Sequence, residues 1–358
     1  MIEQRSRLEW IDGLRGVAAI LVAILHLWLL IRSNVTVINP SLSKGISFFV
    51  SDFFDFGKIG VVVFFLISGY VIPFSLYKAN AKSFLISRFF RLYPAYWLCI
   101  LSFCLISGFS GVKNILINLT MLQKFVGSED LVGVFWTLQI ELIFYFICLI
   151  LHEFNLLNND KFLIKFFYSL LFISLFVAGL RYKFHLKLPV ALILGLAVMF
   201  LGMLWRKNVL DKSSYITNET FKKLIIYFIV ILVPLTLLAY SENFGNNEVW
   251  YRYFASYLIA LLLFKLFSLY KSPGIFLKYL GTISYSMYLL HPVFGMELPV
   301  KIFPKEYFAT HMLLFVLFFW VFTLIAASAC YYLIEKPSIS IGKRLIGKKI
   351  MSKKTTII

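Results

Sequence analysis

Charged residues are scarce in this 358-residue chain: Asp, Glu, Lys and Arg together make up 15%, while 61% of the residues are hydrophobic. Soluble domains carry about a quarter charged residues, so the composition excludes an ordinary soluble protein. Acidic residues are the scarcer kind, with 17 Asp and Glu against 35 Lys and Arg. The net charge of +18 would suggest nucleic-acid binding in a soluble chain, but no basic helix or RNA-binding motif accompanies it. We therefore expect no nucleic-acid partner.

Cysteine is also rare, and its residues carry no recognisable framework. All four lie within apolar stretches: Cys99, Cys104, Cys148 and Cys330. Their spacing is not typical of a metal site or of a set of disulfides. We expect packing cysteines and no metal ion.

What the chain does have is a succession of apolar stretches of about twenty residues, the length that crosses a bilayer as a helix. Backbone groups in lipid must be satisfied within the segment, so these stretches are predicted to be helices. The fold class predicted is an all-α integral membrane protein, a bundle of about ten transmembrane helices. The stretches run approximately over residues 14–32, 57–77, 92–110, 133–151, 162–180, 188–205, 224–240, 253–270, 279–297 and 310–333.

The basic residues predict the orientation of this bundle. With the N-terminus inside, the inner segments hold 23 of the 35 lysines and arginines, which favours cytoplasmic N- and C-termini. The first stretch lacks a small-residue cleavage site and is predicted to be a retained helix. We expect residues 1–334 to form one transmembrane domain and residues 335–358 a basic cytoplasmic tail, solvated or in contact with membrane lipid headgroups.

Two ionisable residues near the ends of one apolar run require a functional or structural explanation. Arg15 and His26 are eleven residues apart, so on a helix they share a face and lie about 16 Å apart along the axis. Asp12 is placed to pair with Arg15. Ionisable residues within membrane helices are functional candidates. The structural alternative is a histidine that only hydrogen-bonds to a neighbouring helix.

Other predicted helices carry polar groups beside prolines. Pro73 follows Ser68 and Tyr70, and Pro292 directly follows His291. Proline has no N–H to continue the helical ladder, and opened helices at membrane depth occur where they face protein or water. Both prolines therefore indicate interruptions next to candidate functional side chains.

Depth estimates place three ionisable groups in one layer of the membrane. Glu141 lies about eight residues into the fourth stretch, His291 about twelve into the ninth, and His26 beyond the middle of the first. A carboxylate beside an imidazole fixes its tautomer, which is the usual arrangement of a general base. The alternative is a structural polar network between helices.

Arg88 and Arg91 are three residues apart and share a face at the predicted cytoplasmic mouth of the third helix. A pair of guanidinium groups suits phosphate recognition. On spacing alone, a positive-inside loop that contacts lipid phosphate explains the pair equally well.

Together these stretches resemble the acyltransferase-3 family of integral membrane acyltransferases over nearly the whole chain. Each is weak alone, but six in this order are specific. They are "LRGVAAILVAILH", which holds the Arg15-x10-His26 pair, "FFLISGY", "RFFRLYPAYW", "FWTLQIELIFY", "SYSMYLLHP" and "EKP" from Glu335 to Pro337.

The resemblance implies a bundle of about ten helices that transfers an acyl group, usually acetyl from acetyl-CoA, to an acceptor hydroxyl. The acceptor is often a sugar of a surface glycan or a lipid-linked sugar, and the location is the bacterial plasma membrane. Acyl-CoA is then a donor substrate, with no permanently bound cofactor. The resemblance ties activity to Arg15 and His26 and the donor to Arg88 and Arg91. Some relatives append a hydrolase-like domain; since this chain ends 25 residues after its tenth stretch, we expect it to lack one.

Residues and resemblance combine into one hypothesis. Arg15, Arg88 and Arg91 hold the donor phosphates, and His26, oriented by Glu141, acts as base or as transient acyl carrier, a choice that the sequence leaves open. The other expected substrate-binding residues are Ser68, Tyr70, Trp136, Tyr288 and His291. The alternatives are a proton-coupled transporter, which also uses broken helices with midplane His and Glu, and a flippase or export component.

Overall fold

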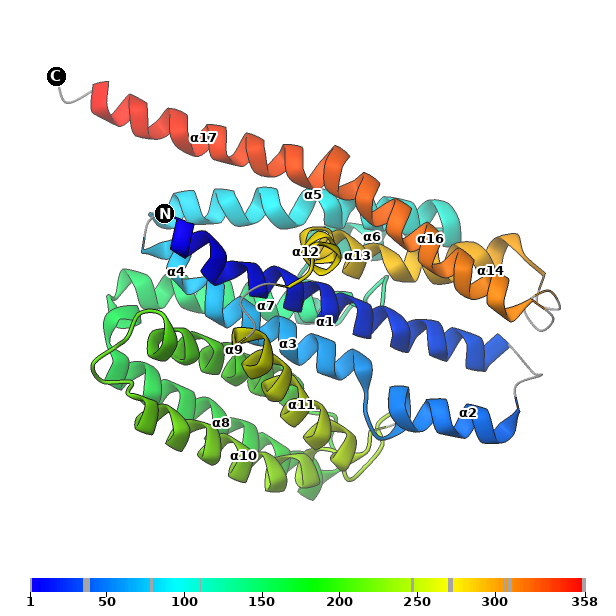
Figure 1. Cartoon of the computed structure of the whole chain (residues 1–358), viewed down its shortest axis with the longest axis horizontal. Coiled ribbons are helices and arrows are strands. Elements are labelled where there is room, and N and C mark those ends of the chain that lie inside the picture. The colour runs from blue at the N-terminus through cyan, green and yellow to red at the C-terminus, as the bar shows by residue number, and fades with distance from the viewer. Residues whose placement is uncertain are drawn as a thin grey trace. The chain divides into compact units, whose positions relative to one another are not determined.

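The structure is a computed structural model that describes residues 2–34, 39–77, 80–109, 111–245, 248–269, 273–304, 307 and 311–355, with the side chains of 2–8 and 348–355 left aside. Within these residues the regular secondary structure is helical throughout, and no strand occurs among them (Figure 1). The predicted all-α class is confirmed.

The chain divides into two compact units, and helix α1 (Ile2–Asn34) contributes to both. Unit 1 comprises Met1–Leu25, Asn39–Phe74 and Ile140–Gly281. Besides the start of α1 it contains α2 (Pro40–Ser47), η1 (Phe48–Asp52), α3 (Phe56–Val71), most of α7 (Phe135–Glu153), η3 (Leu156–Asn158), α8 (Asp160–Phe184), α9 (Val190–Val209), α10 (Asn218–Ala239), α11 (Trp250–Leu269) and α12 (Ile275–Thr282).

Helices α3 and α9 of unit 1 touch backbone to backbone. A Cβ atom at Gly69 would lie 1.7 Å from the carbonyl oxygen of Met199, and one at Gly202 would lie 2.2 Å from that of Leu66. Only glycine permits these approaches, because any side chain would collide with the facing backbone. This contact fixes how the two helices lie against each other.

Unit 2 comprises His26–Ile38, Ser75–Gln139 and Thr282–Ile358. Its elements are the end of α1, α5 (Ala81–Ser107), α6 (Val112–Leu119), η2 (Gln123–Val126), the start of α7, α13 (Ser284–Leu290), η4 (His291–Glu297), α14 (Leu298–Ile302), α16 (Met312–Cys330), η5 (Tyr331–Glu335) and α17 (Lys336–Thr355); the short α4 (Pro73–Leu76) falls on the boundary of the units.

Helix α5 is the element of unit 2 against which two other helices pack. Tyr285 of α13 donates to the carbonyl of Leu92 at 2.8 Å. Helix α17, which contains most of the predicted tail, lies beside α5, and its Ser338 donates to the carbonyl of Phe90 at 2.7 Å (Figure 1). The start of the basic tail is therefore part of the helical packing of unit 2.

Nine helical segments in the described part of the chain are long and apolar enough to cross a membrane, against ten predicted stretches. The difference lies in the stretch 279–297. There α13 ends at Leu290 and the π-helix η4 begins at His291, because Pro292 cannot donate to the helical ladder. The chain is a multi-pass membrane protein in which this segment is a broken helix; the orientation of its termini stays a prediction.

Candidate functional site

Two histidines from distant parts of the chain are in contact within unit 2. Nε2 of His291 lies 3.0 Å from Nδ1 of His26, with the ring centroids 4.9 Å apart. Nδ1 of His291 lies 3.1 Å from the carbonyl oxygen of Met287, one turn earlier. His291 is fully buried, whereas His26 is half-buried. The pair therefore has one ring enclosed by protein and one that is partly accessible.

The hydrogen bonds fix the tautomers of this pair when both rings are neutral. A carbonyl oxygen only accepts, so Nδ1 of His291 carries the proton and its Nε2 accepts. Nδ1 of His26 must then donate to His291, which leaves Nε2 of His26 without a proton. An imidazole nitrogen in this state can accept a hydrogen bond or a proton.

The helical turn that precedes Pro292 holds His291 in place. The carbonyl of Met287 receives the backbone N–H of His291 and faces its Nδ1 as well. His291 is the first residue of π-helix η4. Short π-helical segments often occur at functional sites, and here the segment begins at the residue that orients His26.

Tyr288 and Thr137 form a hydroxyl pair near the histidines. Their oxygens are 2.8 Å apart, and both face the carbonyl oxygen of Val134, at 3.3 Å from Tyr288 and 3.0 Å from Thr137. The Tyr288 ring lies 6.1 Å from that of His291. Trp136 precedes Thr137 on α7 and is 37% exposed. Tyr288 thus links the hydroxyl pair to the ring of His291 within the same unit.

The predicted arginine pair lies on α5. Arg88 donates through Nη2 to Oγ of Ser75 at 3.0 Å, and its guanidinium lies over the ring of Phe84 at 5.1 Å. Arg88 and Arg91 are both half-buried. Arg88 is thus held by specific contacts and is not a freely moving surface charge.

Contacts along α5 relate the arginines to the histidine pair. Helix α13 runs beside α5: its Tyr285 meets Leu92, and Cys99 donates to the carbonyl of Leu289 at 3.1 Å. Arg88 precedes Cys99 by eleven residues, which is about 16 Å of helix. His291 follows Leu289 by two residues, so the arginine end and the histidine end of this unit are about that far apart along α5.

Glu141 lies in unit 1, where it accepts two hydrogen bonds on Oε1. Ser68 donates at 3.0 Å and Tyr145 at 2.7 Å. Arg15 is half-buried on the unit 1 part of α1, whereas His26 belongs to unit 2. The predicted orientation of His26 by Glu141 therefore stays a prediction.

The fourth predicted residue of unit 1, Tyr70, is 2% exposed, and its ring packs edge-on against Trp10 at 5.5 Å. Its carbonyl accepts from Nη1 of Arg206 at 3.2 Å. Arg206 could not be singled out from the sequence, because it stands at the end of an apolar stretch among the basic residues expected there.

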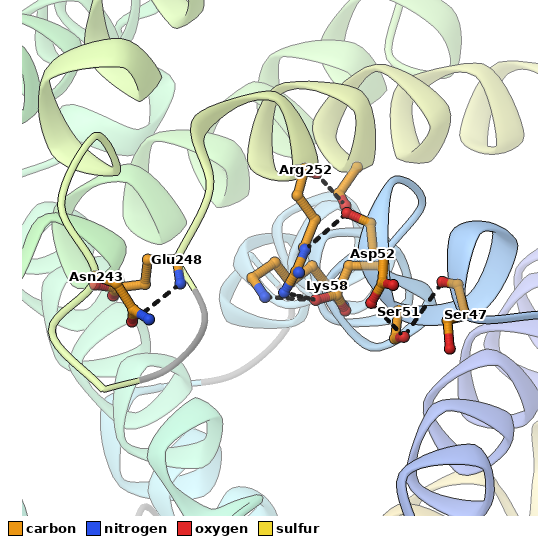
Figure 2. Close-up of polar contacts among 9 residues, drawn as sticks. Ser47, Ser51, Asp52, Lys58, Asn243, Glu248 and Arg252 are labelled. Carbon is orange, nitrogen blue, oxygen red and sulfur yellow. Dashed lines mark hydrogen bonds and ion pairs between the residues drawn. The ribbon is translucent and has the colours of Figure 1, made fainter. Parts of the chain in front are cut away.

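A second polar cluster that the sequence did not reveal lies in unit 1 (Figure 2). Arg181 pairs with Glu248 at 2.5 Å, and both are buried. Arg252 of α11 donates to the carbonyl of Asp52 at 3.2 Å, while Lys58 pairs with Asp55, the N-cap of α3, at 2.5 Å. Cations and anions balance here, which favours a structural network that ties helix ends together.

Within the described residues, no group of three or more His, Cys, Asp or Glu side chains is arranged to hold a metal ion. The four cysteines are buried and unpaired by disulfides.

Known proteins include relatives of this chain. The model of the acyltransferase-3 family, described as an acyltransferase domain, matches residues 8–334. A protein of Acidianus two-tailed virus that is named as a candidate acetyltransferase is 24% identical over 293 residues, which cover 78% of this chain and 81% of the viral protein. No solved structure matches significantly. With a family model that covers most of its length, this chain belongs to the acyltransferase-3 family of membrane acyltransferases.

Proposed function

We propose that the protein transfers an acyl group, in the first instance acetyl, from acyl-CoA to a hydroxyl of an acceptor at the bacterial plasma membrane. The acceptor we propose is a sugar of a surface glycan or of a lipid-linked precursor. Family membership supports the acyl transfer, and the name of the viral relative supports acetyl. The observation that carries the proposal is the contact between His26 and His291, which leaves a basic nitrogen on His26.

In this mechanism Nε2 of His26 takes the proton of the acceptor hydroxyl while the hydroxyl oxygen attacks the thioester carbonyl. The C–O bond of the ester forms, the C–S bond breaks, and the protonated imidazole returns its proton to the leaving thiolate. Alternatively, Nε2 attacks the thioester first, so that an N–C bond forms and the C–S bond breaks as the CoA thiolate leaves. The acceptor hydroxyl oxygen then attacks the acylated imidazole, the C–O bond of the ester forms, the N–C bond breaks, and the hydroxyl proton passes to the thiolate. In both routes His291 accepts from Nδ1 of His26 and keeps the ring oriented.

Arg88 and Arg91 bind the phosphates of the donor in this proposal, since guanidinium groups recognise phosphate oxygens through paired N–H bonds. The distance of about 16 Å along α5 from Arg88 to the level of the histidines is comparable to an extended pantetheine arm. Arg15 is proposed to assist with the phosphates, and Glu141 to support the imidazole. Tyr288 and Trp136 are proposed to contact the acceptor.

The proposal is tested with purified protein in detergent, supplied with acetyl-CoA carrying a labelled acetyl group. We expect saturable loss of the thioester, faster when hydroxylated acceptors are added, and direct binding of CoA. Binding without any consumption of the thioester, or no binding of CoA, would contradict the proposal and favour a transporter or an export component.

A further inference from the structure

Helix α3 is interrupted one turn after the serine that contacts Glu141. The α-helix ends at Val71, and the next helical segment begins at Pro73. Pro73 has no N–H to offer to the preceding turn. Ser68, whose hydroxyl donates to Glu141 at 3.0 Å, lies in the last turn of α3, and its carbonyl still accepts from the N–H of Ile72. Its direction therefore depends on how the interrupted end of α3 is held.

One side chain touches the chain on both sides of Pro73, on α3 and on α4. Arg206, in the last turn of α9, donates through Nη1 to the carbonyl of Tyr70 at 3.2 Å. Its guanidinium also lies over the ring of Phe74, 3.9 Å from the centroid. A planar cation can make both contacts at once, because the hydrogen bond lies in its plane and the ring packs on its face.

Arg206 also lies close to an acidic side chain. Its Nε lies 3.7 Å from Oδ1 of Asp211, in the loop that follows α9, and its side chain is 19% exposed. The backbone contact of Gly69 with Met199 sets α9 against α3 directly beside the interruption. Arg206 follows Met199 by seven residues, two turns further along the same helix.

We propose that Arg206 is a positioning residue that holds the interrupted end of α3 and thereby keeps the Ser68 hydroxyl directed at Glu141. This inference rests on the proposed function, in which Glu141 takes part in acyl transfer. Arg206 touches neither the donor nor the acceptor in this role. Its loss should lower turnover and leave the binding of acyl-CoA unchanged.

The first experiment compares Arg206→Ala and Arg206→Lys with Lys207→Ala. Lys207 is the neighbouring cation on α9, but it pairs with Asp160 at 2.7 Å and so reports the general effect of losing a cation at this helix end. We expect Arg206→Ala to lower kcat by about 10- to 100-fold, as small misplacements of reacting groups do. KM for acetyl-CoA should stay within about twofold of the wild type, with Arg206→Lys partly active and Lys207→Ala close to wild type. A raised KM at normal kcat would make Arg206 a donor contact and overturn the proposal.

The second experiment asks whether Arg206 acts through Ser68. In a double-mutant cycle, adding Arg206→Ala to Ser68→Ala should cause little further loss of kcat, because the directed hydroxyl is already absent. Losses that multiply would show that the two residues act separately and would overturn the proposal.

A measurement that does not depend on enzymatic activity distinguishes failure of the inference about Arg206 from failure of the proposed function. Hydrogen exchange of the amides of residues 70–76 should be faster in Arg206→Ala than in wild type and in Lys207→Ala. The reason is that the contacts of Arg206 with Tyr70 and Phe74 are lost in this variant. If the wild type consumes no acyl-CoA, the proposed function fails whatever this measurement gives. If exchange is unchanged by Arg206→Ala, Arg206 does not hold the segment and the inference fails.

Discussion

Nδ1 of His26 and Nε2 of His291 lie 3.0 Å apart, and the carbonyl bonded to the other side of His291 makes the two rings unequal. His291 accepts from His26, so the second ring nitrogen of His26 carries no proton when both rings are neutral. A neutral imidazole is a weaker orienting group than a carboxylate, but it costs less to bury. The arrangement gives each histidine a distinct role that substitution can test.

Replacing His26 with Ala should abolish acyl transfer while the protein still folds and binds acyl-CoA. Alanine removes the imidazole but leaves an apolar helix that lipid and neighbouring helices accept. Turnover, CoA binding and Tm are measured together on the purified variant. A protein that melts early yet still transfers would show that His26 is only a structural hydrogen-bonding residue.

Replacing His291 with Ala should lower kcat by roughly tenfold or more and leave KM for acetyl-CoA close to wild type. The change removes the acceptor that fixes the tautomer of His26, so fewer molecules present a basic Nε2. His291→Gln restores an acceptor oxygen and is expected to recover part of the activity. Equal activity of the two variants would argue against an orienting role.

Replacing Glu141 with Gln should lower activity by roughly 10²–10⁴-fold if its charge supports the imidazolium that forms during transfer. The amide keeps the shape of the side chain and can still accept from Ser68 and Tyr145. Ser68→Ala, which leaves the carboxylate, is the milder control. The measurement is the initial rate of acetyl-CoA consumption; an unchanged rate in Glu141→Gln would remove Glu141 from the mechanism.

Replacing Arg88 and Arg91 together with Ala should raise KM for acyl-CoA without unfolding the protein. Each lost charged hydrogen bond to phosphate is worth about 1.5–3 kcal/mol, which corresponds to roughly tenfold or more in affinity. Lys82→Ala, at the exposed start of the same helix, controls for the loss of basic charge on α5. Donor affinity that does not change would leave the pair as a topology signal alone.

A cysteine placed at Asn243, between α10 and α11, should react with a membrane-impermeant maleimide from outside the cell. One placed in the tail beyond residue 350 should react only after the membrane is opened. The four native cysteines are buried and give little background. The reverse pattern would contradict cytoplasmic termini and, with them, the cytoplasmic assignment of Arg88 and Arg91.

Helices were predictable because twenty apolar residues in lipid leave the backbone no alternative, and the interruption at His291 was predictable because Pro292 lacks a donor. Depth along a helix also follows from residue number, which places His26 and His291 at similar levels. Their contact depends in addition on the rotation and packing of two helices, which side-chain complementarity decides and a hydropathy pattern does not contain.

The role of Arg206 could not be predicted from the sequence for a related reason. A basic residue at the end of an apolar stretch is expected from the positive-inside rule, so its identity carries no further signal. Its contacts with Tyr70 and Phe74 arise only because Gly69 and Gly202 let α9 approach α3 so closely. Glycines in apolar stretches are common in membrane helices, and nothing in the sequence alone shows that Gly69 and Gly202 lie in the same helix–helix contact.

The close approach of α3 and α9 bears on how the protein is made. Gly69 and Met199 are about 130 residues apart, and ribosomes add about 5–20 residues per second. The ribosome therefore completes the contact region of α3 roughly 7–26 seconds before that of α9. During that interval the stretch of α3 around Gly69 has lipid or another helix in place of α9, whereas Gly57 and Gly60 already face α1. Small residues let membrane helices approach closely, so chains that stall before α9 should associate through the stretch around Gly69.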